Sequence, residues 1–136
     1  VKIEIVSPEQ LLVSETAQSV TVPGSDGYFT VLGDHAPLMS TLKPGFITAV
    51  TAQGSQVFFV RGGFADVAPG GLTILAEQAM PISQFDPNSI DADIEAAELA
   101  LAAASTIEEK SAATEVVDAW RNLKLEAVQA VGATTH

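Results

Sequence analysis

Hydrophobic and polar positions follow two different periods along the chain. Through residue 86 they form short, often alternating runs separated by Pro, Gly, Asp and Ser. This pattern is typical of β-strands joined by tight turns, and such short connections favour antiparallel neighbours. Nine strands are predicted, at residues 1–6, 11–13, 19–22, 28–32, 38–42, 46–52, 57–61, 64–68 and 72–76. The pattern predicts an antiparallel β-sandwich or flattened barrel, with a type I′ turn at Asp26-Gly27.

After residue 86 the apolar positions recur three and four residues apart, as on one face of a helix. Asn88 can cap a first helix. Thr106 and Glu109 have the spacing of a capping box for a second helix, and Gly132 can end that helix. The apolar stripe of the second helix comprises Ala113, Val116, Trp120, Leu123, Ala127 and Val131. We predict that the two helices pack through Ile94, Leu101, Val116, Trp120 and Leu123.

Composition changes at the same place as the period. All seven prolines and nine of the ten glycines lie in residues 1–87, whereas residues 88–136 are rich in Ala, Glu and Leu. The sequence therefore predicts an α+β protein with an N-terminal antiparallel β-sandwich domain at residues 1–86. A C-terminal αα-hairpin domain is predicted at residues 87–136.

Charge and cysteine content narrow the classes of partner. The 136 residues carry a net charge of −11 at pH 7, which disfavours binding to nucleic acid or to an anionic membrane surface. Cysteine is absent, which excludes disulfides, thiolate metal sites and a cysteine nucleophile. No apolar run approaches the roughly 18 residues that a transmembrane helix needs. The composition predicts a protein without a membrane anchor of its own.

Candidate chemistry is sparse. Gly62-Gly63 and Gly70-Gly71 precede predicted strands, whereas a phosphate-binding loop is followed by a helix, so we interpret them as turn glycines. Asp34-His35 could orient an imidazole for acid–base catalysis, but no nucleophile accompanies the pair. A loop histidine that packs or forms a hydrogen bond at the surface is the favoured interpretation. We therefore predict no catalytic residues, no cofactor-binding residues and no metal ligands, and expect a binding or structural module.

Four segments of the sequence resemble one protein family. Gly33-Asp34-His35-Ala36-Pro37-Leu38-Met39, followed by Leu42-Lys43-Pro44-Gly45, is similar to its Gly-His-Ala-Pro-Leu…Lys-Pro-Gly signature. Three further segments follow the family pattern in order: Val22–Gly27, Arg61–Val67 with Pro69-Gly70, and Leu72–Glu77 with Ala79. The family is the epsilon subunit of bacterial F-type ATP synthase, equivalent to the mitochondrial delta subunit. Its β-sandwich followed by an αα-hairpin spans the whole chain.

The resemblance implies a non-catalytic subunit of the rotating central stalk. Such a subunit links the gamma subunit to the ring of c subunits, and couples proton flow to ATP synthesis. By position, the resemblance assigns the interface with the c ring or gamma to Gly27, Tyr28, Phe29, Asp34 and His35. Core packing of Phe29 is the alternative for that residue. A free-standing adaptor whose hairpin recruits another protein is the alternative function.

The resemblance also bears on regulation and location. Many members bind ATP through Ile/Leu-Asp-x-x-Arg-Ala, but Ile94 stands here at the Arg position, so we expect no strong ATP binding. In the family the hairpin can extend and inhibit hydrolysis through contacts with the catalytic alpha and beta subunits. Residues 88–136 carry three basic and nine acidic residues, so we expect little inhibition here. The expected location is peripheral, on the cytoplasmic face of the bacterial inner membrane; the mitochondrial matrix face is the alternative.

Overall fold

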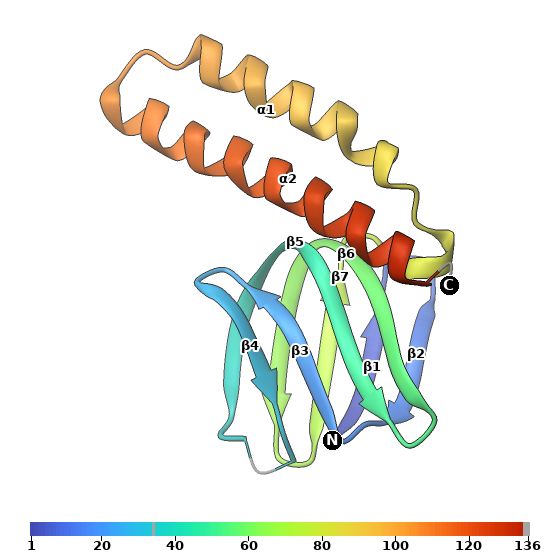
Figure 1. Ribbon diagram of the computed structural model, residues 1–136. Coiled ribbons are helices and arrows are strands. Elements are labelled where there is room, and N and C mark those ends of the chain that lie inside the picture. Colours follow the sequence, from blue (N-terminus) through green and yellow to red (C-terminus); the bar gives the residue numbers. More distant parts are fainter. Residues whose placement is uncertain (34, 135–136) are drawn as a thin grey trace. The chain divides into compact units, whose positions relative to one another are not determined.

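A computed structural model describes residues 1–33 and 35–134, and side chains as far as residue 128. The backbone divides into two compact units, Val1–Ile82 and Ser83–His136. The first unit consists of β-strands and the second of helices, which confirms the predicted fold class of a β-sandwich followed by an αα-hairpin (Figure 1). The division into domains at residues 1–86 and 87–136 stays a prediction.

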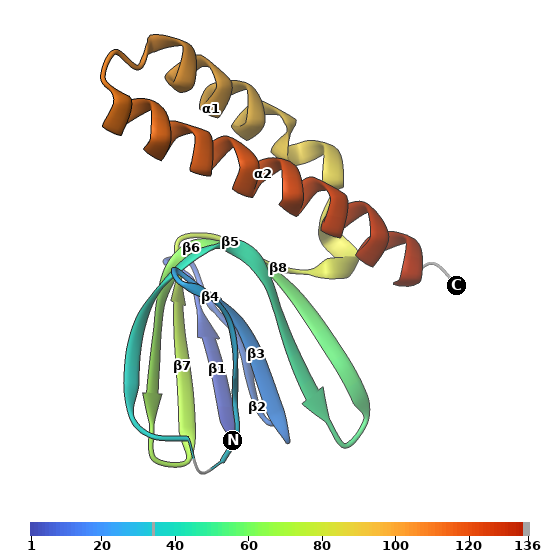
Figure 2. The ribbon, with the colours of Figure 1, turned by 60° about the vertical axis from the view of Figure 1, so that its left-hand side comes forward.

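Eight strands form one sheet that bends over on itself. The strands are β1 (Lys2–Val6), β2 (Leu11–Thr16), β3 (Ser19–Gly24), β4 (Gly27–Val31), β5 (Leu38–Thr51), β6 (Gly54–Ala68), β7 (Gly71–Ala76) and β8 (Ala79–Pro81). Their order is β2-β1-β7-β6-β5-β3-β4, with β8 beside β6. The second half of β6 pairs with β7, whereas Phe58–Val60 of its first half pair with β8. The long strands β5 and β6 therefore belong to both layers of the sandwich (Figure 2).

The bend in β6 lies at Gly62-Gly63, where the sequence predicted a turn between two strands. Both glycines have positive φ, +92° and +130°. A Cβ on Gly63 would lie 2.1 Å from the carbonyl oxygen of Leu75, so this position requires glycine. β5 also continues through Lys43-Pro44-Gly45, where another break was predicted. The predicted strands 38–42 and 46–52 are thus one strand, β5, and the predicted strands 57–61 and 64–68 are one strand, β6. The prediction of nine strands was wrong at these two places, and it also missed β8.

One pairing differs in direction from the prediction. β1 runs parallel to β7, with Lys2 opposite Gly71 and Val6 opposite Leu75, whereas the other described strand pairs are antiparallel. Short connections dictate antiparallel neighbours, but β1 and β7 are far apart in the sequence, so no turn constrains their direction.

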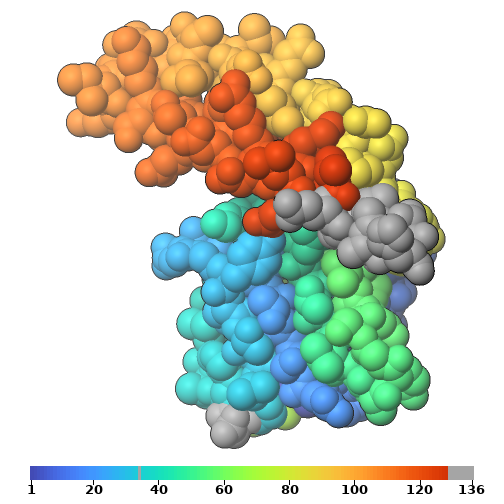
Figure 3. All heavy atoms as spheres, viewed as in Figure 1, coloured from blue at the N-terminus to red at the C-terminus, as the bar shows by residue number. Residues whose placement is uncertain are grey.

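The core lies between the two layers. Alternate residues of the strands point inward, among them Ile3, Ile5, Val20, Ile47 and Ile74, all of which are completely buried. On the face shown in Figure 3, the described side chains of β3, β5 and β6 form a continuous surface without an opening toward this core.

Two short 3₁₀ turns, η1 (Ile82–Gln84) and η2 (Pro87–Ile90), lead from the last residue of the first unit into two α-helices. The helices are α1 (Asp91–Ala103) and α2 (Ile107–Thr134). Asp86 caps η2: its carboxylate accepts a hydrogen bond from the Asn88 backbone N–H at 2.9 Å. α1 follows η2 directly without a side-chain cap, so the prediction that Asn88 caps the first helix was wrong. α2 continues through Gly132, so the prediction that this glycine ends the helix was wrong.

The predicted capping box forms at the start of α2. The hydroxyl oxygen of Thr106 accepts a hydrogen bond from the Glu109 backbone N–H at 3.0 Å. The Glu109 carboxylate accepts from the backbone N–H of Ser105 at 3.1 Å, and from the Ser105 hydroxyl. These bonds favour the charged carboxylate and lower the pKa of Glu109, mainly through the Ser105 backbone N–H. The reciprocal bond therefore reaches Ser105, one residue before the predicted cap.

The packing stripe of α2 is shifted from the prediction at one position. Leu123 is buried, and Ile94, Leu101 and Trp120 are partly buried, but Val116 is 48% exposed. Val117 is buried in its place. Val116 and Val117 are chemically equivalent, and both lie three or four residues from Ala113 and Trp120, so spacing alone did not separate them. The predicted stripe residue Val131 lies outside the described side chains.

Candidate protein interaction surfaces

The described residues contain no metal cluster, since no three His, Asp or Glu side chains among them are placed to hold an ion. Within the same part of the chain, no helix is both long and apolar enough to cross a membrane. We describe next the exposed surfaces of the sandwich.

The first surface is the β3–β4 hairpin, which contains three of the predicted interface residues. Ser25 and Asp26 form its turn, and Gly27 follows with a φ of +130°. A type I′ turn needs positive φ at both central residues, whereas neither Ser25 nor Asp26 has a positive φ. The predicted turn type was therefore wrong. Tyr28 is 44% exposed, and its hydroxyl oxygen accepts a hydrogen bond from the Phe46 backbone N–H at 3.1 Å. The turn thus holds an aromatic ring at the surface.

The remaining predicted interface residues divide between the core and the surface. Phe29 is partly buried and packs against the core cluster. The ring of His35 lies 6.3 Å from the ring of Phe29, and its Nδ1 is 2.7 Å from the carbonyl oxygen of Ala36. Asp34 lies outside the described residues. The structure therefore brings His35 to Phe29, whereas Tyr28 stands separately on the exposed side of the strand.

An open groove of about 500 Å³ adjoins this hairpin. Its walls are residues 24–29 and the first four residues of β5, Leu38–Thr41. Leu38 and Met39 are 41% and 66% exposed, so the groove has apolar residues on the side opposite Tyr28. Sequence reasoning assigned Leu38 and Met39 to a signature and did not identify them as an exposed surface.

The second surface is a row of exposed apolar residues on the outer face of the sheet. Phe64 of β6 lies opposite Leu75 of β7, Leu75 lies opposite Val6 of β1, and Val6 lies opposite Leu11 of β2. Phe64, Leu75 and Leu11 are 41%, 54% and 57% exposed, and Val6 is half-buried. We call these four residues the apolar row. Cross-strand neighbours contact one another, so the row is a continuous apolar surface across four strands.

The groove and the apolar row are adjacent. Thr41 pairs with Phe64, and Met39 lies two residues before Thr41 on the same face of β5. Met39 therefore extends the apolar row toward the groove. The sequence contained a hint of this surface. Phe64 and Leu75 stand at positions of their strands where the alternation of apolar and polar residues would place a polar, outward-facing side chain. Only the pairing of β1 with β7 shows that they share a face with Leu11.

Known proteins resemble the chain in both sequence and fold. Residues 1–82 match the family described as "ATP synthase, Delta/Epsilon chain, beta-sandwich domain". The ATP synthase epsilon chain of Parvibaculum lavamentivorans is 42% identical over 123 residues, which are 89% of this chain and 92% of that protein. The epsilon chain of Brucella anthropi is 46% identical over 111 residues, 81% of this chain and 82% of that protein.

A third relative matches over a shorter segment. The epsilon chain of Mesorhizobium japonicum is 51% identical over 86 residues, which span 62% of this chain and 64% of that protein.

Two solved structures share the fold. A chain of the Euglena gracilis mitochondrial ATP synthase structure "OSCP/F1/c-ring in rotational state 1" has a TM-score of 0.65 at 18% identity, covering 100% of this chain and 81% of that chain. A chain of the Tetrahymena thermophila "central stalk/cring" structure has a TM-score of 0.61 at 14% identity, covering 93% and 94%. With residues 1–82 matched and bacterial relatives aligned over most of its length, this chain belongs to the ATP synthase delta/epsilon chain family, as an epsilon-type subunit.

Proposed function

We propose that the chain is a non-catalytic subunit of the central stalk of F-type ATP synthase. In this role the sandwich binds the gamma subunit and the c ring, and transmits torque during proton-driven rotation. The apolar row is the observation that carries the proposal, because a contiguous exposed apolar surface marks a protein interface. Family membership supports the assignment. The Tetrahymena structure that shares the fold is a central-stalk and c-ring assembly, and the Euglena structure contains F1 and the c-ring.

The apolar row suits a permanent interface with gamma. It lies across four hydrogen-bonded strands, so the backbone holds its side chains in fixed positions. Association then costs little conformational entropy, and the aromatic ring of Phe64 can serve as an anchor. A contact that transmits torque needs this stiffness, because a flexible loop would deform under load and the partner would not turn with it.

Substitutions in the apolar row test the contact with gamma. Phe64→Asp and Leu75→Asp place a charge at exposed positions, so the sandwich should fold normally. Each should weaken binding of purified gamma by at least about tenfold, the range seen for interface anchors. Leu99→Asp is the matched control, because Leu99 is 65% exposed on α1, outside the sandwich. Unchanged gamma binding in both sandwich variants would contradict the proposal, and no stoichiometric binding by the parent chain would favour the adaptor.

The β3–β4 turn is the proposed contact with the c ring. Tyr28 and the exposed wall of the groove offer an aromatic and aliphatic surface, with Gly27 and His35 nearby in the sequence. Because the chain has no cysteine, a single Asp26→Cys variant reacts at one known place. We expect it to cross-link to cysteines introduced in the polar loop of the c subunit. Gln53→Cys, in the β5–β6 turn, is the control and should not cross-link.

The location follows from this assembly. We propose that the protein is peripheral on the cytoplasmic face of the bacterial inner membrane, attached through the complex alone. The bacterial relatives support this side over the mitochondrial matrix face. Membrane fractions should release the chain together with the catalytic part of the complex. Recovery of the isolated chain on protein-free vesicles would contradict attachment through the complex.

The hairpin contributes to assembly or stability in our proposal, with little inhibition and no strong ATP binding. Ile94 is partly buried at the position where ATP-binding members have Arg, and the hairpin carries an excess of acidic residues. Deleting residues 88–136 should leave ATP hydrolysis by the assembled enzyme nearly unchanged. A several-fold rise would contradict this. Titration calorimetry should detect no low-micromolar binding of ATP to the isolated chain.

A further inference from the structure

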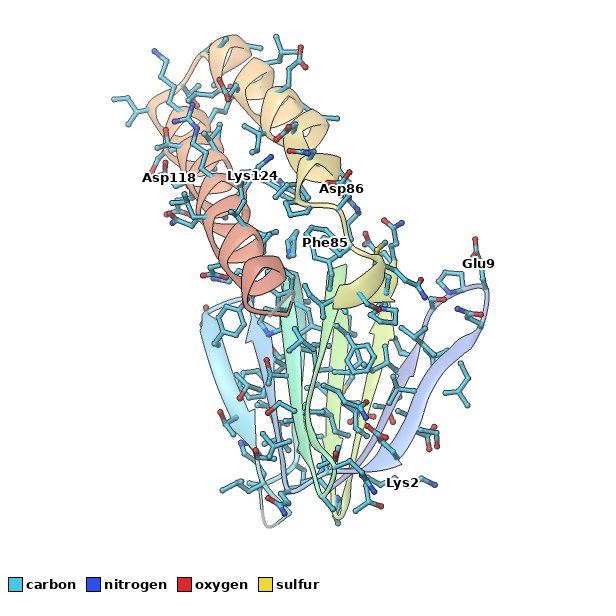
Figure 4. All side chains as sticks on the ribbon, turned by 45° about the vertical axis from the view of Figure 1, so that its right-hand side comes forward. Lys2, Glu9, Phe85, Asp86, Asp118 and Lys124 are labelled. Atoms are coloured by element: carbon cyan, nitrogen blue, oxygen red, sulfur yellow. The ribbon has the colours of Figure 1, made fainter. Side chains whose placement is uncertain are left out.

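Lys124 of α2 reaches across the hairpin to the start of α1. Its Nζ lies 2.6 Å from Oδ1 of Asp91 and 3.1 Å from Oδ1 of Asn88. The Lys124 side chain is 24% exposed, so it is more enclosed than Asp91, which is 58% exposed. Figure 4 shows Lys124 on the part of α2 that faces the start of the helical unit, near Asp86, with Asp118 on the other side of α2. One ammonium group thus joins two residues more than thirty positions away.

A second ion pair lies along the same edge. Arg121, one turn before Lys124, has its guanidinium 3.3 Å from the carboxylate of Glu98. Residues three apart on α2 and seven apart on α1 share a face, so the two pairs form a seam between the helices. Lys124 holds the end of the seam nearest η2. Arg121 and Glu98 are both about half exposed, which makes the Lys124 pair the more shielded of the two.

Apolar packing between the helices is limited on the α1 side. Ala97 is the buried residue of α1 among those described, and Ile94 and Leu101 are partly buried. The buried apolar residues that α2 contributes are Val117, Leu123 and Ala127. Because alanine buries little area and the larger α1 residues are only partly covered, the two ion pairs add to a modest apolar contact.

We propose that Lys124 is a latch for the hairpin, and that its ammonium group, held by Asp91 and Asn88, sets how readily α1 and α2 separate. These ion pairs engage basic side chains that the hairpin would otherwise present to an acidic partner. The helical unit has three basic residues, Lys110, Arg121 and Lys124, and two of them form the seam. An acidic surface offered to α2 must therefore compete with Asp91 and Glu98. The closed hairpin needs no bound ligand in this scheme, and the proposal does not depend on the stalk role.

Amide hydrogen exchange of the full-length chain tests the latch. Lys124→Met keeps the aliphatic stem and removes the charge, and Asp91→Asn removes the partner charge. Each should speed exchange in α1 and in the facing turns of α2 about three- to tenfold, as for loss of a partly shielded charged hydrogen bond. Exchange in β1–β7 should not change. Lys110→Met, which removes an exposed charge from the first turn of α2, should match the parent.

Three further variants distinguish a latch from a loss of packing. Lys124→Arg keeps the charge and should retain most of the protection. The Lys124→Met/Asp91→Asn double variant should exchange no faster than the faster single variant, because both remove the same interaction. The difference between parent and Lys124→Met should shrink at about 1 M salt. Parent-like exchange in Lys124→Met, additive effects in the double variant, or Lys124→Arg as fast as Lys124→Met would each overturn the proposal.

Discussion

The sandwich and the hairpin differ in the contacts that stabilise them: backbone hydrogen bonds between strands and a large buried core in one, side-chain contacts between two helices in the other. In the sandwich, every long strand is hydrogen-bonded to neighbours, and large side chains such as Ile3, Ile47 and Phe59 are completely buried. In the hairpin, each helix satisfies its own backbone, and the helices meet through a few apolar residues, such as Val117 and Leu123, and a charged seam. The sandwich should therefore be sensitive where backbones approach closely, and the hairpin where a few side chains meet.

Gly63→Ala is expected to have the largest effect. Its Cβ would overlap the Leu75 carbonyl oxygen, and the φ of +130° disfavours any side chain. We expect a loss of about 3 kcal/mol or more in the stability of the sandwich, measured as lost exchange protection in β6 and β7. Gly54→Ala is the matched control: its φ is +122°, but nothing lies within 4 Å of the added Cβ. Equal losses in the two variants would mean that backbone conformation alone, without the close approach, determines the cost.

Leu123→Ala should have the next largest effect, confined to the hairpin. Leu123 is 4% exposed, so truncation should cost about 2–3 kcal/mol. Val116→Ala should cost less than about 0.5 kcal/mol, because Val116 is 48% exposed. Trp120, the single tryptophan, reports both by its fluorescence during denaturant unfolding. A larger loss of stability for Val116→Ala than for Leu123→Ala would contradict this assignment and would favour the stripe predicted from the sequence, in which Val116 is buried.

Glu109→Gln should produce a smaller effect that depends on pH. The Ser105 hydrogen bonds lower the Glu109 pKa from its ordinary value of 4.5, so the charged carboxylate stabilises the folded helix start. This contribution is present above the unfolded pKa and is lost as pH falls through the lower folded pKa. Parent and variant should therefore differ in hairpin stability near neutral pH and converge in acid. A difference that grows as the pH falls would contradict the assigned direction.

Removal of the hairpin should affect the sandwich least. A chain ending at Asp86 should remain a soluble all-β protein with cooperative unfolding, and it should still bind gamma. A second truncation after Ile82, where the compact unit ends, checks whether residues 83–86 matter to the sandwich. Non-cooperative unfolding in both fragments would show that the sandwich depends on the helices, which would remove the contrast between the two units.

Sequence patterns predicted elements well where one local rule operates. The Thr106–Glu109 box was correct because its partners lie within one turn of helix. The bend at Gly62-Gly63 was interpreted as a break because a glycine pair indicates either a turn or a close approach of backbones, and Leu75 decides between them. Val116 and Val117 were indistinguishable by spacing.

The apolar row was missed for a different reason. Its residues come from four strands, and each alone is an ordinary exposed apolar side chain. Only long-range pairing places Leu11, Val6, Leu75 and Phe64 in one line, and no local pattern encodes that pairing. The predicted interface residues came instead from a short signature, and Phe29 among them packs against the core.

The parallel pairing of β1 with β7 governs the order of events during synthesis. β1 is synthesised before the other strands of this sheet, but it can pair with β7 only after residues 71–75 have left the ribosome. Contacts so distant in sequence close slowly, since the whole intervening loop loses entropy before they form. Until then β1 presents an unpaired edge, and a nascent β2–β1 hairpin is open to aggregation. The helices α1 and α2 follow β7 in the sequence, so the pairing that covers β1 does not require their residues.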